Sequence, residues 1–403
     1  MKRLKILMLT RLFPSHAFPA FGTFCIERAK ALAVHADVRV MVPTPYYPKW
    51  LPGKEDWKKW TRVERQGSVE NNIRVTYPRY ASVPGTATWL QGVTMVRSAR
   101  RDLESNYGDW RPDVIDGHFA FPDGYAATRL GRAIGAPVVV TCHGSDLRQY
   151  PDIPVAGAMT RWTLRHADRV ISVSSDLMRR SITLGCPTER AVFLTNGVDP
   201  SKFSVRAQSD CRAQLGLPLD RKIGVYVGFL IDRKDQSLIL HALVELRQQG
   251  KPVPLIVLVG DGPNRQRLEN EVVVLGLQND VILAGQRRHD EVALWMGAAD
   301  WLLLSSSSEG WATVYFEAMA CGRPVLTSNV SSAKDAIHSP EFGMVVEPRT
   351  AQAFAAAMNA ASLKTYDENV IRHYAEQNSW EQWAGNALKL FESIIESKKH
   401  ATG

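Results

Sequence analysis

Short apolar runs alternate with amphipathic segments along almost the whole chain, and this alternation limits the possible folds more than any other feature of the sequence. A short apolar run matches a strand that is buried on both faces of a sheet, and apolar residues at helical spacing follow most of these runs. Strands that alternate with helices over short connections form a mostly parallel sheet covered by helices on both faces. The sequence therefore predicts an α/β protein.

The alternation occurs in two series, one in each half of the chain. In the first series the predicted strands are Lys5–Leu9, Val38–Val42, Val114–Asp116, Pro137–Thr141, Arg169–Val173 and Ala191–Leu194, and the clearest helices are Phe24–Ala36 and Tyr125–Ile134. In the second series the strands are Ile223–Gly228, Leu255–Gly260, Val281–Ala284, Trp301–Leu304, Pro324–Thr327 and Gly343–Val346, and the helices are Gln236–Gln249, Arg265–Leu275, His289–Gly297 and Val314–Cys321. Strand patterns vanish in the polar segment Asp199–Asp220, so the two series are expected to join there. The sequence thus predicts two doubly wound domains in tandem, whose ligands bind beyond the carboxyl ends of the strands.

The composition excludes several classes of protein. The 403 residues are 45% hydrophobic and 22% charged, which is ordinary for globular domains and unlike disordered or fibrous chains. The five cysteines are scattered and never spaced as CxxC, which argues against a zinc ribbon or a disulfide scaffold and fits a reduced cytosolic protein. No stretch approaches the roughly 18 apolar residues of a membrane-spanning helix, so any membrane contact is expected to be peripheral.

Positive charge is concentrated in the first half of the chain. Residues 1–200 contain 28 basic and 18 acidic residues, a net charge of +10, whereas residues 201–403 contain 21 and 23, a net charge of −2. A basic half beside a neutral half indicates that only one of them faces an anionic partner. Nucleic acid, an anionic membrane and a phosphorylated acceptor are the alternatives.

The segment Glu309–Glu317 (EGWATVYFE) carries the most information in the second half. The strand Trp301–Leu304 and the serine-rich turn Ser305–Ser308 precede it, and a helix follows that Gly322 is suited to end. Backbone amides at the start of a helix lack acceptors within the helix, so those around Trp311–Val314 are expected to favour a phosphate.

Glu309 and Glu317 are candidate ligands for hydroxyl groups. Glu309 directly precedes the predicted helix and is placed to accept hydrogen bonds from a sugar, while one carboxylate such as that of Glu317 can bind both hydroxyls of a ribose. An ordinary helix cap and one solvated glutamate explain the periodicity equally well.

The E-x7-E spacing, followed by Ala318–Val325 (AMACGRPV), resembles the signature of the family 4 retaining glycosyltransferases, which adopt the GT-B fold. Further segments that match the family in the same order are Thr141–Asp146 (TCHGSD), Asn196–Asp199 (NGVD) with Phe203, Gly260–Pro263 (GDGP), Ala299–Asp300 and Ser379–Trp383 (SWEQW). The resemblance implies two Rossmann-like domains that face each other across a cleft. Residues 1–200 would form the acceptor-side domain, residues 201–375 the nucleotide-sugar-binding domain, and residues 376–403 a helix that returns to the first domain.

The resemblance also implies roles for the donor-binding residues. Glu309 would hold hydroxyls of the donor sugar, and Glu317 would hold the ribose of the nucleotide. The backbone amides that would bind the diphosphate and the sugar belong to Gly310, Trp311, Ala312, Thr313 and Val314. Gly260 and Gly262 would shape the nucleotide pocket through close backbone approach, although an ordinary tight turn explains Asp261 as well.

The segment after strand Ile223–Gly228 departs from the family pattern. The family usually has an arginine directly after this glycine and a Lys-Gly pair further on, whereas this sequence has Phe229 in the arginine position and Asp235 after Lys234. We predict that Lys234 binds the donor diphosphate and that Arg233 is a candidate for the missing arginine. A solvated, charged helix start is the alternative.

Four residues of the first half are candidates near the reaction centre. Gly22 matches the glycine of a loop close to the donor phosphate and the acceptor, and His143 matches a histidine that contacts the donor sugar. Asp146 is expected to orient His143 or to cap the next helix, and His118 is expected to approach the acceptor or the sugar. A buried histidine bonded to the backbone is the alternative for His143.

The segment Tyr46–Arg62 interleaves aromatic rings with lysine and arginine. Aromatic rings favour the headgroup level of a bilayer, and each cation gains from anionic lipid. We therefore expect this segment to meet an anionic membrane or a lipid-diphosphate acceptor, with an irregular solvated loop as the alternative.

Taken together, these features predict a retaining glycosyltransferase that needs neither a metal nor a cofactor, since the sequence has no Asp-x-Asp metal signature. The expected donor is a nucleotide-diphosphate sugar, with a UDP-sugar favoured over GDP-mannose, and the expected acceptor is a lipid-linked molecule or a polysaccharide of the bacterial surface. The candidate catalytic residues are His143, Glu309 and Lys234.

Two other functions fit parts of the sequence. A nucleotide-sugar 2-epimerase shares two such domains, and a non-catalytic glycosyltransferase-like binding protein would explain Phe229. Nucleic-acid binding is disfavoured because the sequence contains no recognition module. We expect the protein in the cytoplasm, at the inner face of the plasma membrane.

Overall fold

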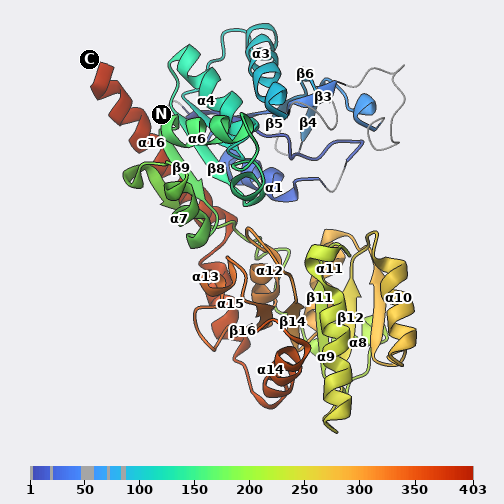
Figure 1. Cartoon of the computed structure of the whole chain (residues 1–403). Coiled ribbons are helices and arrows are strands. Elements are labelled where there is room, and N and C mark those ends of the chain that lie inside the picture. Colours follow the sequence, from blue (N-terminus) through green and yellow to red (C-terminus); the bar gives the residue numbers. More distant parts are fainter. Residues whose placement is uncertain (1–2, 19–20, 47–58, 70–72, 83–87, 403) are drawn as a thin grey trace. The chain divides into compact units, whose positions relative to one another are not determined.

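The computed structural model in Figure 1 describes residues 3–18, 21–46, 59–69, 73–82 and 88–402. The chain forms two compact units, one made of Met1–Asn196 with Trp380–Gly403 and the other of Gly197–Ser379. The polar segment Asp199–Asp220, where we expected the join, lies inside the second unit and contains helix α8 (Gln208–Leu215). The chain therefore passes between the units just before this segment. Most of the aromatic and cationic segment Tyr46–Arg62 lies outside the described residues.

The first unit contains an eight-stranded sheet in the order β10-β9-β8-β7-β1-β2-β5-β4. Its strands are β1 (Lys5–Leu9), β2 (Asp37–Met41), β4 (Gln66–Val69), β5 (Ile73–Thr76), β7 (Val114–His118), β8 (Val138–Cys142), β9 (Arg169–Ser172) and β10 (Ala191–Phe193). Neighbouring strands are parallel except β4 and β5, and β3 (Thr44–Tyr46) and β6 (Arg79–Ala81) form a separate parallel pair. The helices of this unit are α1 (Thr23–Ala33), α3 (Thr88–Asn106), α4 (Asp123–Ile134), α5 (Ser145–Arg148), α6 (Ala156–His166), α7 (Ser175–Thr183) and α16 (Trp380–Thr402), with short 3-10 turns at Trp60–Arg62 and Thr188–Arg190.

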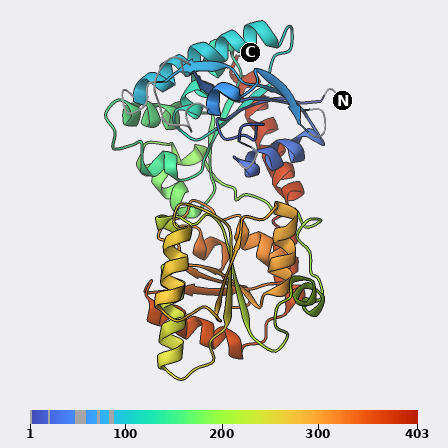
Figure 2. The same cartoon turned by 90° about the vertical axis from the view of Figure 1, so that its right-hand side faces the viewer.

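The second unit contains a six-stranded, wholly parallel sheet in the order β13-β12-β11-β14-β15-β16. Its strands are β11 (Ile223–Val227), β12 (Leu255–Val259), β13 (Val281–Gly285), β14 (Trp301–Leu304), β15 (Val325–Ser328) and β16 (Gly343–Val346). Besides α8, its helices are α9 (Gln236–Gln248), α10 (Arg265–Val274), α11 (His289–Ala298), α12 (Val314–Ala320), α13 (Ala333–Ala336), α14 (Ala351–Leu363) and α15 (Glu368–Glu376), and a 3-10 turn covers Asp232–Lys234. Figure 2 shows helices on both sides of this sheet. The predicted α/β fold with two doubly wound units is confirmed.

The C-terminal helix α16 completes the core of the first unit. Trp380, Trp383 and Phe391 of this helix are buried in one cluster with Cys25 of α1 and Met8 of β1. Burial of each large apolar side chain contributes about 1.5–3 kcal/mol, so the last residues of the chain are integral to a unit that begins at the other end of the sequence. Among the described helices none is long and apolar enough to cross a membrane.

An aspartate directly before one parallel strand repeatedly binds the first amide of the neighbouring strand. Asp113 accepts the backbone N–H of Lys5, the first residue of β1, at 2.8 Å. In the same way Asp168 accepts that of Val138 at the start of β8 at 2.8 Å, and Asp300 accepts that of Ile223 at the start of β11 at 2.7 Å. These carboxylates satisfy amides that the sheet leaves unpaired at its amino edge. Asp300, which belongs to the Ala299–Asp300 segment that resembles the family, therefore has the structural role of binding the first amide of β11.

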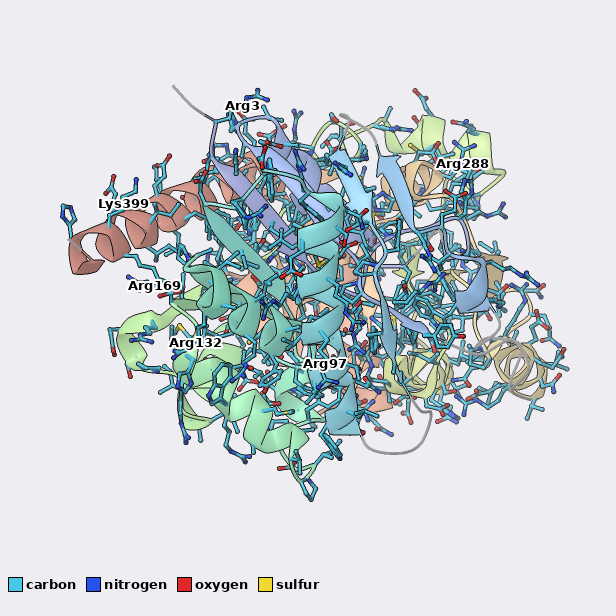
Figure 3. All side chains as sticks on the ribbon, turned by 90° about the horizontal axis from the view of Figure 1, so that it is seen from above. Arg3, Arg97, Arg132, Arg169, Arg288 and Lys399 are labelled. Carbon is cyan, nitrogen blue, oxygen red and sulfur yellow. The ribbon has the colours of Figure 1, made fainter. Side chains whose placement is uncertain are left out.

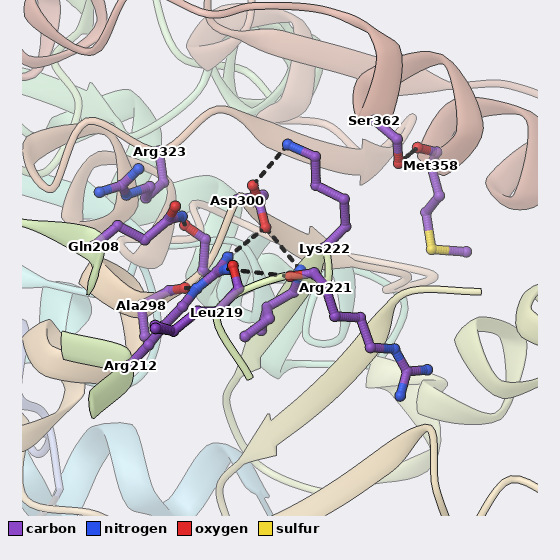
Figure 4. A network of polar contacts seen from close by, with 12 residues as sticks. Gln208, Arg212, Leu219, Arg221, Lys222, Ala298, Asp300, Arg323, Met358 and Ser362 are labelled. Atoms are coloured by element: carbon purple, nitrogen blue, oxygen red, sulfur yellow. Dashed lines mark hydrogen bonds and ion pairs between the residues drawn. The ribbon is translucent and has the colours of Figure 1, made fainter. Parts of the chain in front are cut away.

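Asp300 belongs to the polar network of Figure 4. The guanidinium of Arg212, on α8, donates to Asp300 Oδ2 at 2.8 Å and to the carbonyl of Ala298 at 2.9 Å, while Lys222 Nζ lies 3.0 Å from Oδ1. The Arg212 side chain is only 5% exposed, whereas that of Lys222 is 50% exposed. Arg212 therefore joins α8 to the sheet in a setting shielded from water.

We predict that Arg212→Ala lowers the free energy of unfolding by about 3 kcal/mol, because it removes the buried cation that pairs with Asp300 and leaves several carbonyl groups without their donor. Lys222→Ala is the matched control and should cost less than about 1 kcal/mol, since it removes an exposed partner of the same carboxylate. Urea unfolding followed by tryptophan fluorescence measures both. Equal losses would contradict this account of the network.

Candidate active site

Each sheet reverses its strand order at one position, and the candidate residues gather there. In the second unit the chain builds β11, β12 and β13 in one direction and β14, β15 and β16 in the other, so β11 and β14 are neighbours. The loops that leave such a pair at its carboxyl end separate to opposite faces of the sheet and leave room for a ligand. Arg233 and Lys234 follow β11, and Glu309 follows β14.

Two cations meet the carboxylate of Glu309 at this position. Lys234 Nζ lies 2.6 Å from Oε1, and Arg233 Nη1 lies 3.2 Å from Oε2. Burial is the largest single influence and would raise the pKa of Glu309, but the pairing with Lys234, the nearby hydroxyl of Ser306 and the charge of Arg233 together outweigh it, so the pKa of this carboxyl lies below its ordinary value. The cluster combines one negative and two positive groups and therefore keeps a surplus of positive charge for an anionic ligand.

The turn that carries these cations is tied to the serine-rich turn after β14. The carbonyl of Arg233 accepts the amide of Ser307 at 2.9 Å, and the carbonyl of Asp235 accepts the hydroxyl of Ser305 at 2.6 Å. The alternative of a solvated helix start fits Arg233 in part, since its side chain is 48% exposed, but Lys234 is only 14% exposed and both cations point to Glu309 from the turn before α9.

Asp235, which takes the place of the glycine expected from the family resemblance, adopts a left-handed backbone conformation with φ of +46°. Aspartate tolerates this region better than most residues, and Arg349 pairs with its carboxylate at 2.5 Å. The strained residue thus sits directly after Lys234 and is held by an arginine that follows β16. Sequence analysis did not find Arg349, because no local pattern connects it to Asp235.

The backbone of residues 310–314 presents a run of free donors beside Glu309. The amides of Gly310, Trp311, Ala312, Thr313 and Val314 have no hydrogen-bond acceptor in the described part of the chain. The side chains of Trp311, Ala312 and Val314 are nevertheless buried. Amide donors in a sheltered position favour an anion.

Glu317, on α12, has a neighbour that the sequence did not reveal. Its Oε1 lies 3.3 Å from Nε2 of His289, which begins α11, and its side chain is 14% exposed. The ring of His289 also packs edge-on against Phe203, at 5.0 Å between centroids. Phe203, which follows the NGVD match, therefore supports the histidine beside the predicted ribose ligand.

Gly260 and Gly262 approach the loop after β11 so closely that no side chain fits. A Cβ atom on Gly260 would lie 1.9 Å from the carbonyl oxygen of Gly228, and one on Gly262 would lie 2.4 Å from that of Leu230. The amide of Leu230 donates to the carbonyl of Asp261 at 3.0 Å. Close backbone approach is thus observed between the two loops, and it sets the path of the segment that leads to Lys234.

In the first unit the order reverses between β1 and β7, and His118 ends β7. His143 follows the next strand, β8, and its Nε2 lies 3.0 Å from Nδ1 of His118. His118 is fully buried, so the expectation that it approaches an acceptor directly is incorrect: its ring lies behind that of His143. Burial is the main cause that lowers the pKa of both histidines, so both are neutral at pH 7.

Asp146 supports the backbone instead of the histidine ring. Its carboxylate accepts the amides of Ala120 and Gly144 at 2.8 Å and that of His143 at 3.2 Å, and its side chain is fully buried. Of the two roles expected for Asp146, it orients His143 only through the backbone amide, and its oxygens join the turn after β8 to the turn after β7.

Gly22 precedes α1 with φ of +72°, and a Cβ atom there would lie 2.3 Å from the carbonyl oxygen of Leu12. Only glycine fits this close approach between the two ends of the loop after β1.

Two family models match consecutive parts of the chain. The model for glycosyl transferases group 1 matches residues 208–378, and the model for Glycosyltransferase Family 4 matches residues 22–202. A Bacillus subtilis (strain 168) protein named as a teichuronic acid biosynthesis glycosyltransferase, TuaC, is 32% identical over 368 residues, which cover 88% of each chain. The chain belongs to the group 1 glycosyltransferases.

Further similarities of this glycosyltransferase extend over nearly its whole length. An Escherichia coli (strain K12) protein named for colanic acid biosynthesis, WcaI, is 26% identical over 390 residues, which cover 88% of this chain and 92% of that protein. The solved structure of sucrose-phosphate synthase from Thermosynechococcus elongatus superposes with a TM-score of 0.76 at 19% identity, covering 98% of this chain and 100% of the other. The likeness in structure confirms the GT-B fold. These comparisons give no support to the epimerase alternative.

We predict that Asp235→Ala destabilises this glycosyltransferase more than Asp235→Gly, by about 1 kcal/mol. Both variants lose the pair with Arg349, but only alanine must adopt the left-handed conformation against its steric preference. Thermal unfolding of the two variants gives the difference directly, and an alanine variant as stable as the glycine variant would refute the strain at this position.

Proposed function

We propose that this glycosyltransferase moves a sugar from a nucleotide-diphosphate sugar to a hydroxyl of a lipid-linked or polysaccharide acceptor, with retention of anomeric configuration. The observation that carries the proposal is the convergence of Lys234 and Arg233 on the buried Glu309, beside the free amides of residues 310–314. The names of the two relatives, which refer to teichuronic acid and colanic acid, support a role in bacterial surface polysaccharide biosynthesis.

The groups of the cluster fit the charges of the reaction. As the bond to the sugar breaks, negative charge develops on the nucleotide diphosphate, and Lys234, Arg233 and the free amides supply fixed positive charge for it. Arg233 thereby takes the function of the arginine that Phe229 replaces, without a metal ion in the proposed reaction. Glu309, which is ionised, accepts hydroxyl groups of the donor sugar.

The acceptor hydroxyl attacks the sugar on the face that the diphosphate leaves. In this same-face reaction an oxygen of the donor phosphate removes the proton of the hydroxyl, and the retained configuration follows without a carboxylate nucleophile. The contribution of the protein is to hold donor and acceptor close together and to stabilise the leaving group. We propose that Glu317 holds the ribose and that His143 contacts the donor sugar. A UDP-sugar is the preferred donor in the proposal.

The first test is the effect of Lys234→Ala and Glu309→Gln on transfer, after a thermal-shift screen of UDP-, GDP- and ADP-sugars has identified the donor. Each substitution should lower kcat/KM by about 10²- to 10³-fold, because it removes a group that faces developing charge or a sugar hydroxyl. Lys334→Ala, in α13 of the same unit, is the control, since this lysine is 69% exposed and should not affect transfer. Wild-type activity in Lys234→Ala would refute the proposed diphosphate site.

We also propose that the first unit contacts an anionic membrane. Figure 3 shows Arg132, Arg169 and Lys399 on the same side of this unit. A pocket of about 390 Å³ opens among cationic side chains of this unit and has Asp168 as its single carboxylate. Its cationic and titratable lining residues are Arg132, Arg165, His166, Arg190 and Lys398. Cations at a membrane surface gain about 1 kcal/mol each from anionic lipid, so this face fits such a partner.

Sedimentation with phosphatidylglycerol-containing vesicles tests the membrane contact. The double variant Arg132→Glu with Arg165→Glu should bind at least about 30-fold more weakly, and salt should weaken binding of the wild type. Arg372→Glu, an exposed arginine of α15 in the second unit, provides the control. Equal binding of all three proteins, or equal binding to neutral phosphatidylcholine vesicles, would count against this surface.

A further inference from the structure

A chain of polar side chains connects His143 to a buried carboxylate. Nε2 of His143 lies 3.0 Å from Nδ1 of His118, and Nε2 of His118 lies 3.3 Å from Oδ2 of Asp116. The two imidazole rings are nearly parallel, at an angle of 11°. His118 and Asp116 are completely buried, whereas the side chain of His143 is partly accessible.

The order of these contacts fixes where the protons lie. A carboxylate only accepts hydrogen bonds, so Nε2 of His118 carries the proton that faces Asp116. A neutral imidazole has a single N–H, so Nδ1 of His118 is an acceptor and Nε2 of His143 must be the donor to it. Nδ1 of His143 is then left with a free lone pair, and it has no partner among the described residues.

A buried arginine of the same core carries a charge opposite to that of Asp116. Arg28, on α1, is fully buried and interacts electrostatically with Asp116, and burial lowers the pKa of Arg28 to about 10. Its guanidinium donates to Asn196 Oδ1 at 2.9 Å and to Thr141 Oγ1 at 3.2 Å, and it lies 4.5 Å above the ring of Trp383. Asn196 and Trp383 belong to the NGVD and SWEQW matches, so these two motifs hold the buried arginine in place.

Aromatic neighbours restrict the ring of His143. Phe24 and Phe119 contact it at 4.8 and 4.6 Å between ring centroids. Phe119 has φ of +64°, a conformation that costs about 1–2 kcal/mol for a residue with a side chain and that persists only where the surroundings enforce it. One of the strained backbone positions therefore lies directly against this histidine.

We propose that Asp116 and His118 are positioning residues that keep the proton of His143 on Nε2, so that Nδ1 accepts a hydrogen bond from a hydroxyl of the sugar donor. The role toward the donor rests on the proposed glycosyl transfer, whereas the position of the proton is a property of the protein alone. Asp116, His118 and Arg28 act through His143 and do not contact the substrate.

Nitrogen-15 NMR of the ligand-free, histidine-labelled protein tests the position of the protons. Both His118 and His143 should show a protonated Nε2 and an unprotonated Nδ1, with signals assigned by their loss in His118→Asn and His143→Gln. Asp116→Asn removes the charge and introduces N–H donors next to His118. His143 should therefore be a mixture of the Nε2–H and Nδ1–H forms in this variant. A proton on Nδ1 of His143 in the wild type would overturn the proposal.

A pair of substitutions at His118 separates positioning from packing. The Oδ1 atom of asparagine can take the place of Nδ1 of His118, so His118→Asn should accept the proton of His143 and keep kcat within about threefold of the wild type. Glutamine places its amide near the position of Nε2 instead. His118→Gln should therefore lower kcat about tenfold, which corresponds to the loss of one hydrogen bond of about 1.4 kcal/mol. Equal losses in the two variants would mean that His118 serves only to fill the core.

The two experiments distinguish the two proposals. Absence of sugar transfer together with the Nε2–H form of His143 would overturn the proposed function and support the assignment of the protons. Normal transfer together with a proton on Nδ1 would overturn this inference and leave the proposed function intact.

Discussion

The placement of β11 beside β14 is the constraint on which the candidate donor site depends. Because the chain continues from β11 to one side of the sheet and from β14 to the other, the loops after these strands separate and leave their polar groups facing a common space. Lys234 and Glu309 are 75 residues apart in the sequence, and they meet at 2.6 Å because their strands are neighbours. The pair of β1 and β7 has the same position in the first unit, where the histidines lie at the ends of β7 and β8.

Electrostatic balance explains how a charged carboxylate is accommodated in this cluster. A carboxylate as buried as that of Glu309 is costly unless cations compensate it, and Lys234 and Arg233 do so. The same cations exceed the charge of the carboxylate, so a diphosphate that enters beside the free amides finds positive charge already in place. In the first unit Arg28 and Asp116 are both buried in the core and interact electrostatically without a direct ion pair.

The strands, the main helices and the position of the charged cluster could be predicted from the sequence, because apolar runs determine buried parallel strands locally. Predicted strand limits such as Lys5–Leu9 and Trp301–Leu304 match the structure. The short strands of the region between β2 and α3 were missed, since β3 and β6 have three residues each and little apolar periodicity. Contacts between distant residues, such as Arg349 with Asp235, leave no local pattern, and burial of His118 and Asp146 followed from packing that spacing does not encode.

The crystal structure of a complex with a nucleoside diphosphate tests the central claim most directly. The account predicts that the phosphate nearest the sugar position accepts hydrogen bonds from Lys234 Nζ and from at least two amides of residues 310–314, while the ribose hydroxyls bind Glu317. A diphosphate bound away from the loops after β11 and β14, with the pair of Lys234 and Glu309 unchanged, would contradict it.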